Sequence, residues 1–267
     1  MPKKYLFCII IAGLWGVFNL IPFLKGTDVY LFSDIILWFA LGTSATTTIY
    51  IIELTLRMFP LFLFQIFFGT YIYQHFCSAS IYQFSRFNRR INWFLKEVVL
   101  LYSYAFCFTL VMVLTGSFVV WLRGSLSFDR TSFIIFGYYL IIHSLWLFIL
   151  TLSINIIAIK LNSSTAFSLI SGGQILLTSA LLLSSQTIDG IQNIWLLKIN
   201  PIFYLILSWR SSFISAVHER IDLFGIGSDL NISVFLFIIL TLIVIIGGAV
   251  LVKKHDLIAT NSETGGI

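Results

Sequence analysis

The sequence predicts an all-α, polytopic membrane protein with about six transmembrane helices. Two observations support this prediction, the composition and a series of long apolar runs. Of the 267 residues, 59% are hydrophobic and only 10% are charged, and the mean hydropathy is +1.00. A soluble domain carries about 25% charged residues, so this chain has too few to cover a water-facing surface. A bilayer removes that requirement, because helices that face lipid can be apolar on every side.

Six apolar runs are long enough to cross a bilayer, which takes about 20 mostly apolar helical residues. The expected spans are residues 5–24, 54–76, 98–122, 133–158, 166–184 and 232–252. The first span is expected to bend near Pro22. Strands are not expected, because open strand edges would leave main-chain groups unpaired in lipid. Residues 1–267 therefore form a single transmembrane domain.

The distribution of Lys and Arg predicts the orientation of the chain. With the N-terminus inside, the inner segments carry nine basic residues against three acids, and the outer segments carry seven against eight. This inward excess of positive charge predicts an N-in, C-in topology. The net charge of +5 is thus an orientation signal, and no nucleic-acid partner is expected.

The segment between the second and third spans, residues 77–97, is the most informative stretch. It predicts a basic amphipathic helix at the cytoplasmic surface, because two kinds of residue recur at helical spacing. The apolar face holds Phe84, Phe87, Ile91 and Phe94, and the polar face holds Ser85, Arg89, Asn92 and Lys96. One interpretation is a docking helix that inserts into a soluble partner. The other is an interfacial anchor whose arginines Arg86, Arg89 and Arg90 rest on anionic lipid headgroups.

Several polar groups lie within or beside the apolar runs. Glu53 and Arg57 are four residues apart and are expected to pair on one helix face, either at a substrate site or as a structural link. His143, Gln65 and Gln174 are expected to hydrogen-bond between helices. The glycine pairs Gly172–Gly173 and Gly247–Gly248 are expected to permit close helix approach.

Enzyme motifs are absent from the sequence. It contains no GxxxxGK[ST] phosphate loop, no HExxH helix and no GxSxG elbow. The cysteines Cys8, Cys77 and Cys107 form no CxxC pair, so neither a disulfide framework nor a metal site is expected. We therefore expect no catalytic residue and no cofactor in this chain, and any ATP would be hydrolysed by another subunit.

Three motifs carry a resemblance to a known family. The first is the amphipathic segment 77–97, which lies between the second and third spans, where that family has its coupling helix. The second is the stretch INPIFYLILSWRSS, Ile199–Ser212, and the third is LVKKHDLI, Leu251–Ile258. With the size and the six-helix plan, these make the chain similar to the membrane subunits of type-2 ABC exporters, the permeases of ATP-binding-cassette transporters. The connection Lys25–Glu53 is longer than that family's pattern.

The resemblance implies partners and roles. A second permease subunit, identical or not, and two cytoplasmic ABC ATPase subunits that hold ATP and Mg²⁺ would complete the transporter. The residues that would contact the ATPase are Phe84, Arg86, Phe87, Arg89 and Arg90. Short outer re-entrant helices would lie in residues 199–217, with Pro201, Tyr204 and Arg210 shaping an outer gate. The expected substrate is hydrophobic or amphipathic, such as an antimicrobial peptide or a lipid, in a bacterial cell membrane.

Two alternatives remain open at this stage. The first is a non-transporting membrane protein that confers immunity or acts as a sensor and needs no ATPase. The second is an intramembrane enzyme, for which His143, Glu53 and Arg57 would be the only candidate residues.

Overall fold

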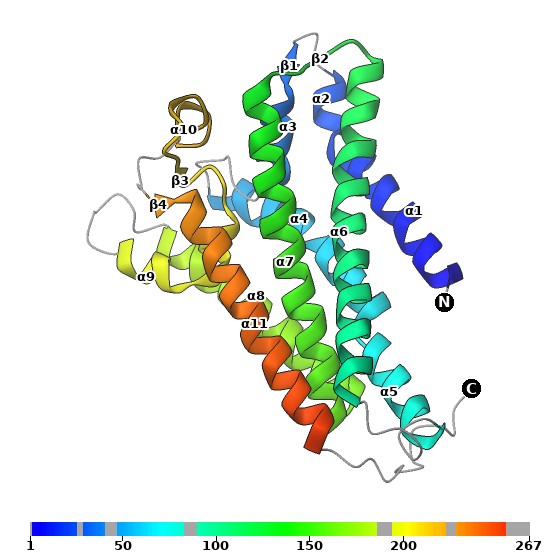
Figure 1. The fold of residues 1–267 in the computed structure, drawn as a ribbon. Coiled ribbons are helices and arrows are strands. Elements are labelled where there is room, and N and C mark those ends of the chain that lie inside the picture. The colour runs from blue at the N-terminus through cyan, green and yellow to red at the C-terminus, as the bar shows by residue number, and fades with distance from the viewer. Residues whose placement is uncertain are drawn as a thin grey trace.

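The structure is a computed structural model and describes residues 2–25, 29–40, 47–82, 90–185, 194–222 and 228–254. The described chain is almost entirely helical (Figure 1). The longer helices are α1 (Pro2–Asn19), α4 (Thr47–Phe68), α5 (Tyr71–Tyr82), α6 (Arg90–Leu122), α7 (Arg130–Lys160), α8 (Ser163–Ser185) and α11 (Leu230–Lys254). Short elements join them: α2 (Ile21–Lys25), α3 (Phe32–Phe39), α9 (Ile194–Ile199), the 3₁₀ turn η2 (Pro201–Leu205) and α10 (Ser215–Ile221).

Four helices are long and apolar enough to cross a bilayer: Arg90–Leu122, Arg130–Lys160, Ser163–Leu181 and Leu230–Lys254. They contain the predicted spans 98–122 and 133–158, most of 166–184, and 232–252. The part of α1 from Lys4 to Asn19 is apolar but shorter. The chain is therefore an all-α, polytopic membrane protein, as its composition predicts.

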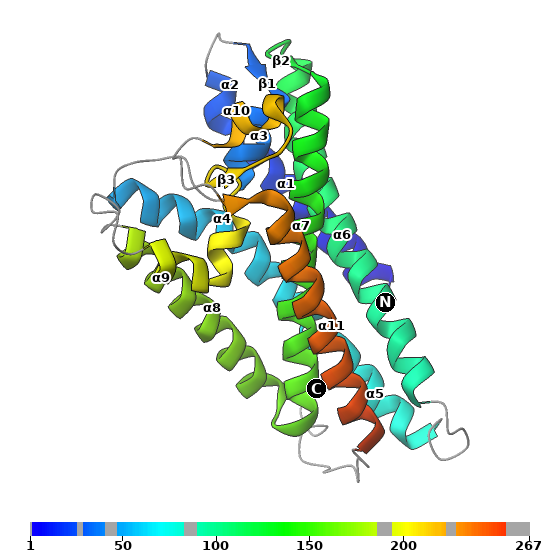
Figure 2. The same ribbon diagram turned by 60° about the vertical axis from the view of Figure 1, so that its left-hand side comes forward.

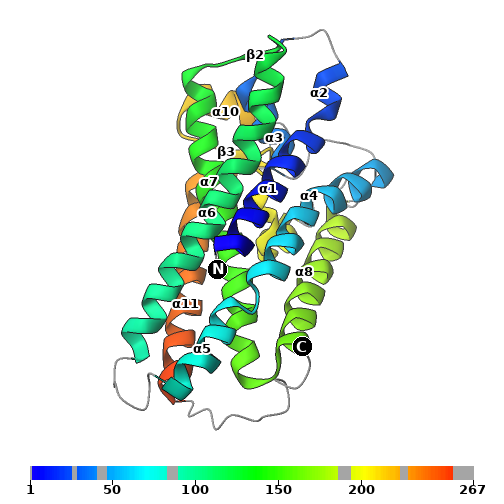
Figure 3. The same cartoon turned by 90° about the vertical axis from the view of Figure 1, so that its right-hand side faces the viewer.

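Successive long elements alternate in direction. α1, α6 and α8 run toward the end at which the strand β1 (Tyr30–Leu31) pairs in parallel with β2 (Leu126–Ser127), and α4, α5, α7 and α11 run away from it (Figures 1 and 3). Ring contacts agree with this arrangement, since Phe64 meets Phe108 while Phe68 meets Tyr104, as antiparallel helices require. We call this end the β end and the opposite end the basic end.

The predicted first and second spans differ from the structure in their continuity. The first is broken at Leu20, where α1 gives way to the short helix α2 that contains Pro22. The second begins earlier, at Thr47, and is broken at Gly69–Thr70 between α4 and α5. Pro60 lies inside α4 and removes one main-chain donor there.

The third long helix begins eight residues before its predicted start. Residues 90–97, which belong to the predicted amphipathic helix, are the first turns of α6 and continue directly into the apolar part of the helix. They stay helical because Phe94 turns inward, is fully buried and lies beside Gly248 of α11. Residues 83–89 lie outside the described residues.

A very close helix contact joins α1 to α6. A Cβ atom added to Gly16 would lie 2.0 Å from the carbonyl oxygen of Met112, and one added to Gly116 would lie 2.5 Å from the carbonyl oxygen of Gly16. Helices in membranes approach closely where small residues meet. The predicted glycine pairs behave differently, because Gly172, Gly173 and Gly247 face open space and Gly248 alone of the four is in close contact.

At the β end the chain folds back along the bundle. After α2 and β1, α3 returns beside α7, and the indole nitrogen of Trp38 donates to the carbonyl of Asn19 at 3.0 Å (Figure 2). A second parallel strand pair, β3 (Arg210–Ser211) with β4 (Ser228–Asp229), precedes α11. These short elements bring α1, α3, α4, α6 and α7 together around the interior site described below.

Candidate functional site

The break between α4 and α5 is closed by one side chain from α7. In an unbroken helix the amide of Ile72 would donate to the carbonyl of Phe68, four residues earlier. Here the carboxamide of Asn155 stands between them: Oδ1 accepts from the Ile72 amide at 2.7 Å, and Nδ2 donates to the Phe68 carbonyl at 2.9 Å. Non-helical backbone at membrane depth is tolerated only where such partners exist, so Asn155 permits this break.

Asn155 uses its remaining capacity as well. Its Oδ1 also accepts from the amide of Tyr73 at 3.1 Å, and its Nδ2 donates to the carbonyl of Thr151 at 2.8 Å. The side chain is fully buried. The apolar pattern of the sequence does not single out Asn155, although a carboxamide in the middle of a long apolar run is a recognisable signal.

Two glutamines connect α4 to α8. The amide of Gln65 donates to Oε1 of Gln174 at 2.9 Å, and the hydroxyl of Ser171 lies 3.5 Å from Oε1 of Gln65. Gln174 also directs its amide at the sulfur of Met58, at 3.4 Å. Both glutamines are buried, so the predicted interhelical bonding of Gln65 and Gln174 is confirmed.

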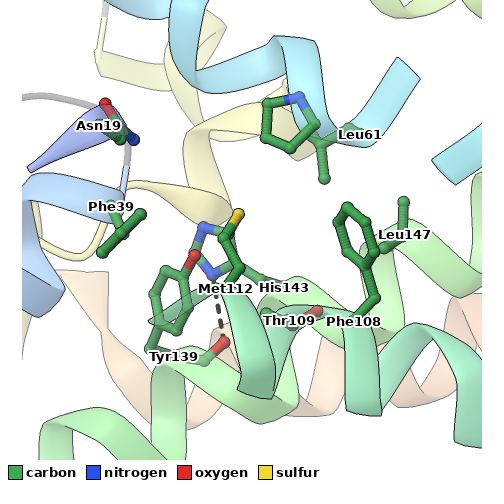
Figure 4. A pocket seen from close by; sticks show the side chains of 10 residues that line it. Asn19, Phe39, Leu61, Phe108, Thr109, Met112, Tyr139, His143 and Leu147 are labelled. Carbon is green, nitrogen blue, oxygen red and sulfur yellow. Dashed lines mark hydrogen bonds between the residues drawn. The ribbon is translucent and has the colours of Figure 1, made fainter. Parts of the chain in front are cut away.

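A small cavity lies at the crossing of α1, α3, α4, α6 and α7. Its volume is about 20 Å³. It is lined by Asn19, Phe39, Pro60, Leu61, Phe108, Thr109, Met112, Tyr139, His143 and Leu147 (Figure 4). A cavity needs at least roughly 10–15 Å³ to hold a water molecule, so this one accommodates a single water and excludes larger ligands.

His143 is the chemically distinctive residue of this cavity. It is 5% exposed, its ring stacks on Tyr139 with centroids 4.1 Å apart, and its Nδ1 lies 3.2 Å from the carbonyl oxygen of Tyr139 in the same helix. No described residue bonds to its Nε2, which is buried. The predicted hydrogen bond from His143 to another helix is therefore not found among the described residues.

A polar pair lies between α5 and α6 toward the basic end. Nδ1 of His75 lies 3.3 Å from Oε2 of Glu97. Glu97 is 13% exposed and His75 is 30% exposed. The pair links the two helices that lead into and out of residues 83–89.

Arg210 organises the connection before α11. It is fully buried, donates from Nη1 to the hydroxyl of Ser228 at 2.6 Å, and donates from Nη2 to the carbonyl of Phe203. Its guanidinium also lies over two rings, 4.0 Å from the centre of Phe203 and 4.5 Å from that of Tyr204. Burial lowers the pKa of Arg210 to about 9, which still leaves the group charged at neutral pH.

The predicted outer-gate residues therefore lie together. Pro201 begins η2, which is capped by the Asn200 side chain accepting from the Ile202 amide at 3.0 Å, and Tyr204 lies in the same turn beneath Arg210. The predicted re-entrant region 199–217 consists of this 3₁₀ turn, β3 and the start of α10, and a gating role stays a prediction.

Most of the remaining predicted site residues, or their side chains, lie outside the described residues. Phe84, Arg86, Phe87 and Arg89 lie outside the described residues, whereas Arg90 begins α6 and is partly exposed. Glu53 and Arg57 lie on α4, but their side chains are outside the described set. Their pairing stays a prediction.

Comparisons with protein-family models, with curated proteins and with solved structures find no match for this chain. The fold and the buried polar contacts define the class, a polytopic membrane protein of helices.

Proposed function

We propose that this chain is the permease subunit of an ATP-driven exporter of the type-2 ABC class. It would work with a second permease subunit and with cytoplasmic ABC ATPases that bind ATP and Mg²⁺. The observation that carries the proposal is the geometry on either side of residues 83–89, where the predicted ATPase contacts lie. One arm of this segment is a hinged half-helix and the other is the longest helix of the described chain.

The hinged arm is α5. It is separated from α4 at Gly69–Thr70, and its first main-chain amides are held by Asn155 of the buried helix α7. Because hydrogen bonds to a side chain leave more orientational freedom than a continuous helix, α5 can change its angle without unfolding α4. A partner that moves residues 83–89 would therefore tilt α5 about Asn155.

The second arm is α6, which runs from Arg90 to Leu122 without a break. At about 1.5 Å per residue this helix reaches roughly 50 Å, longer than the hydrocarbon core of a bilayer. Its close packing on α1 at Gly16 means that α1 moves with it. His75 of α5 lies 3.3 Å from Glu97 of α6, so a protonated His75 would link the two helices and let them respond to the partner together.

The charges of the described residues favour the N-in, C-in, six-span topology that this proposal requires. Described basic residues at the basic end are Arg90, Lys96, Lys160, Lys253 and Lys254. The one described acid there is Glu97, which leaves a net charge of +4. The β-end connections carry a net charge of +1, with six described basic residues, Lys25, Arg123, Arg130, Lys198, Arg210 and Arg220, against five acids, Asp34, Asp129, Glu219, Asp222 and Asp229. Positive charge concentrates on the cytoplasmic side of membrane proteins. α1 and the broken pair α4–α5 would be the first and second spans.

The cavity beside His143 limits where a substrate can pass. At about 20 Å³ it is far too small for a lipid or a peptide. We expect a hydrophobic or amphipathic substrate to move between two permease subunits, along helices whose apolar faces are exposed here. α11 is the clearest of these, since only 11% of its most apolar stretch is buried.

The docking claim is tested by co-purification with ABC ATPases encoded beside the protein's gene. Arg89→Glu/Arg90→Glu is expected to abolish co-purification and the stimulation of ATP hydrolysis. Lys253→Glu/Lys254→Glu is the matched control, because it reverses two charges at the same end of the bundle outside the segment. If both double variants retained assembly and stimulation, the docking claim would be lost, and a non-transporting immunity or sensor protein would become the better hypothesis.

The topology is tested with single cysteines in a variant from which Cys8, Cys77 and Cys107 have been removed. A cysteine at Phe213, which is 87% exposed in the connection before α11, is expected to react with a membrane-impermeant maleimide on intact cells. A cysteine at Asn88 is expected to react only after lysis. The reverse pattern would exclude an inward-facing coupling segment.

A further inference from the structure

The cavity at the crossing of α1, α3, α4, α6 and α7 is lined partly by polar side chains, and the proposed transport mechanism does not use them. His143 projects toward it from the buried helix α7, beside Tyr139 and Met112 (Figure 4). The side chain is more than nine-tenths buried, and its Nε2 has no hydrogen-bond partner in the described part of the chain. A buried polar atom without a hydrogen-bond partner destabilises the fold, so a ligand at this atom is favoured.

The hydrogen bond at the other ring nitrogen determines what the ligand must be. Nδ1 faces the carbonyl oxygen of Tyr139, and a carbonyl only accepts, so the proton of the neutral ring sits on Nδ1. Nε2 is then a bare acceptor. The hydroxyl of Thr109 gives its own proton to the carbonyl of Ala105 at 2.8 Å, so it too presents lone pairs to the cavity. A ligand in this cavity must therefore be a hydrogen-bond donor.

The charge of the lining residues and the volume of the cavity further restrict which hydrogen-bond donor can bind. The 10 lining residues include no Asp or Glu, so a cation would lie in an apolar interior without a counter-charge, which is costly. A volume of about 20 Å³ fits one water molecule and nothing larger. Asn19, also in the wall, supplies a carboxamide as a further partner.

We propose that this cavity is a binding site for one internal water molecule, which donates to Nε2 of His143 and to the hydroxyl of Thr109. The water would join α7 to α6 at the point where Pro60 interrupts the hydrogen bonding of α4. This inference rests on the geometry of the cavity and stands whether or not the chain is an exporter subunit.

Radiolytic labelling tests the site directly, because hydroxyl radicals formed from a bound water oxidise the side chains beside it. Methionine is readily oxidised, and the chain contains only three. Met112 lines the cavity and is 6% exposed, whereas Met58 is 3% exposed and does not line it, which makes Met58 an internal control. We expect Met112 to gain oxygen several-fold faster than Met58 in the purified, lipid-embedded protein.

Substitutions identify the partner of the water. His143→Phe keeps an aromatic ring on Tyr139, fills the cavity and removes the acceptor, so labelling of Met112 is expected to fall to the level of Met58. His143→Gln retains an acceptor and is expected to keep most of the labelling, and Thr109→Val is expected to reduce it. If Met112 and Met58 label equally in the native protein, the proposal is overturned, and this comparison needs no variant to fold.

Discussion

The two long apolar helices α7 and α11 lie side by side and run in the same direction, but their surroundings are opposite. In the most apolar stretch of α7, 83% of the residues are buried within the protein, against 11% in α11. The mean hydropathy runs the other way, at 2.2 for α7 and 3.1 for α11. In a bilayer the lipid-facing helix is thus the more apolar one, and the central helix carries the polar groups.

The difference follows from the hydrogen bonds that the side chains of each helix provide. α7 provides Asn155, Thr151 and His143, and its Asn155 completes the main-chain bonds of the broken pair α4–α5. In the described part of the chain, no side chain of α11 completes the main-chain bonds of a broken helix, and its glycine Gly247 faces open space. Since lipid offers no hydrogen bonds, a polar side chain is useful only where protein surrounds it. The comparison predicts which substitutions are costly.

The largest effect is expected for Asn155→Leu. The change leaves the amides of Ile72 and Tyr73 and the carbonyl of Phe68 without their partner, each costing about 1–3 kcal/mol. We expect a loss in the free energy of unfolding on the order of 3 kcal/mol or more, measured by denaturation in mixed micelles.

The matched control for Asn155→Leu lies on α11. The hydroxyl of Thr241 is buried and bonds to none of the described residues, so Thr241→Val removes an unpaired group and is expected to leave stability unchanged or to raise it slightly. Equal losses from the two substitutions would show that the contrast between α7 and α11 is wrong.

The sequence predicts the positions of the unbroken helices well, because a long apolar run in lipid has no alternative to helix. It does not predict the break at Gly69–Thr70, since the residue that permits it, Asn155, lies more than 80 positions further along the chain. Nor does it predict the early start of α6, which depends on Phe94 finding space beside Gly248.

The polar sites divide in the same way. The bond between Gln65 and Gln174 is predicted because two carboxamides in neighbouring spans have few other partners in lipid. The environment of His143 is not predicted, because its Nδ1 bonds within α7 and its Nε2 faces a cavity formed by five separate elements. Sequence pattern records which groups need partners, and the packing of distant elements decides which partners they have.

The second-largest loss of stability is expected for a substitution at a tightly packed glycine. In Gly16→Ala the added methyl group would lie 2.0 Å from the main-chain oxygen of Met112, so α1 must move away from α6. Overpacking of this kind costs about 1–3 kcal/mol, and we expect a corresponding fall in melting temperature.

A graded series on α11 sharpens the glycine test. Gly247→Ala meets open space and is expected to leave stability unchanged, whereas Gly248→Ala meets the ends of the Phe94 and Ile156 side chains at 2.6 and 2.7 Å. Those side chains can shift, so Gly248→Ala is expected to fall between the other two. If the losses of stability did not decrease in the order Gly16→Ala, Gly248→Ala, Gly247→Ala, the difference in packing inferred for these glycines would be wrong.

The smallest effect is expected where α8, only 22% buried in its most apolar stretch, meets α4. A double-mutant cycle of Gln65→Leu and Gln174→Leu is expected to give a coupling energy of about 0.6 kcal/mol, the average for such bonds inside membrane proteins. The modest value follows because glutamines in a partly unfolded bundle also find partners. Each single variant leaves one buried carboxamide without its partner on the other helix, so the double variant should lose less stability than the two single losses added together. If the two losses were strictly additive, the bond between Gln65 and Gln174 would contribute nothing, and apolar packing alone would orient α8. In that case α8 would resemble α11, whose apolar surface is mostly exposed to lipid.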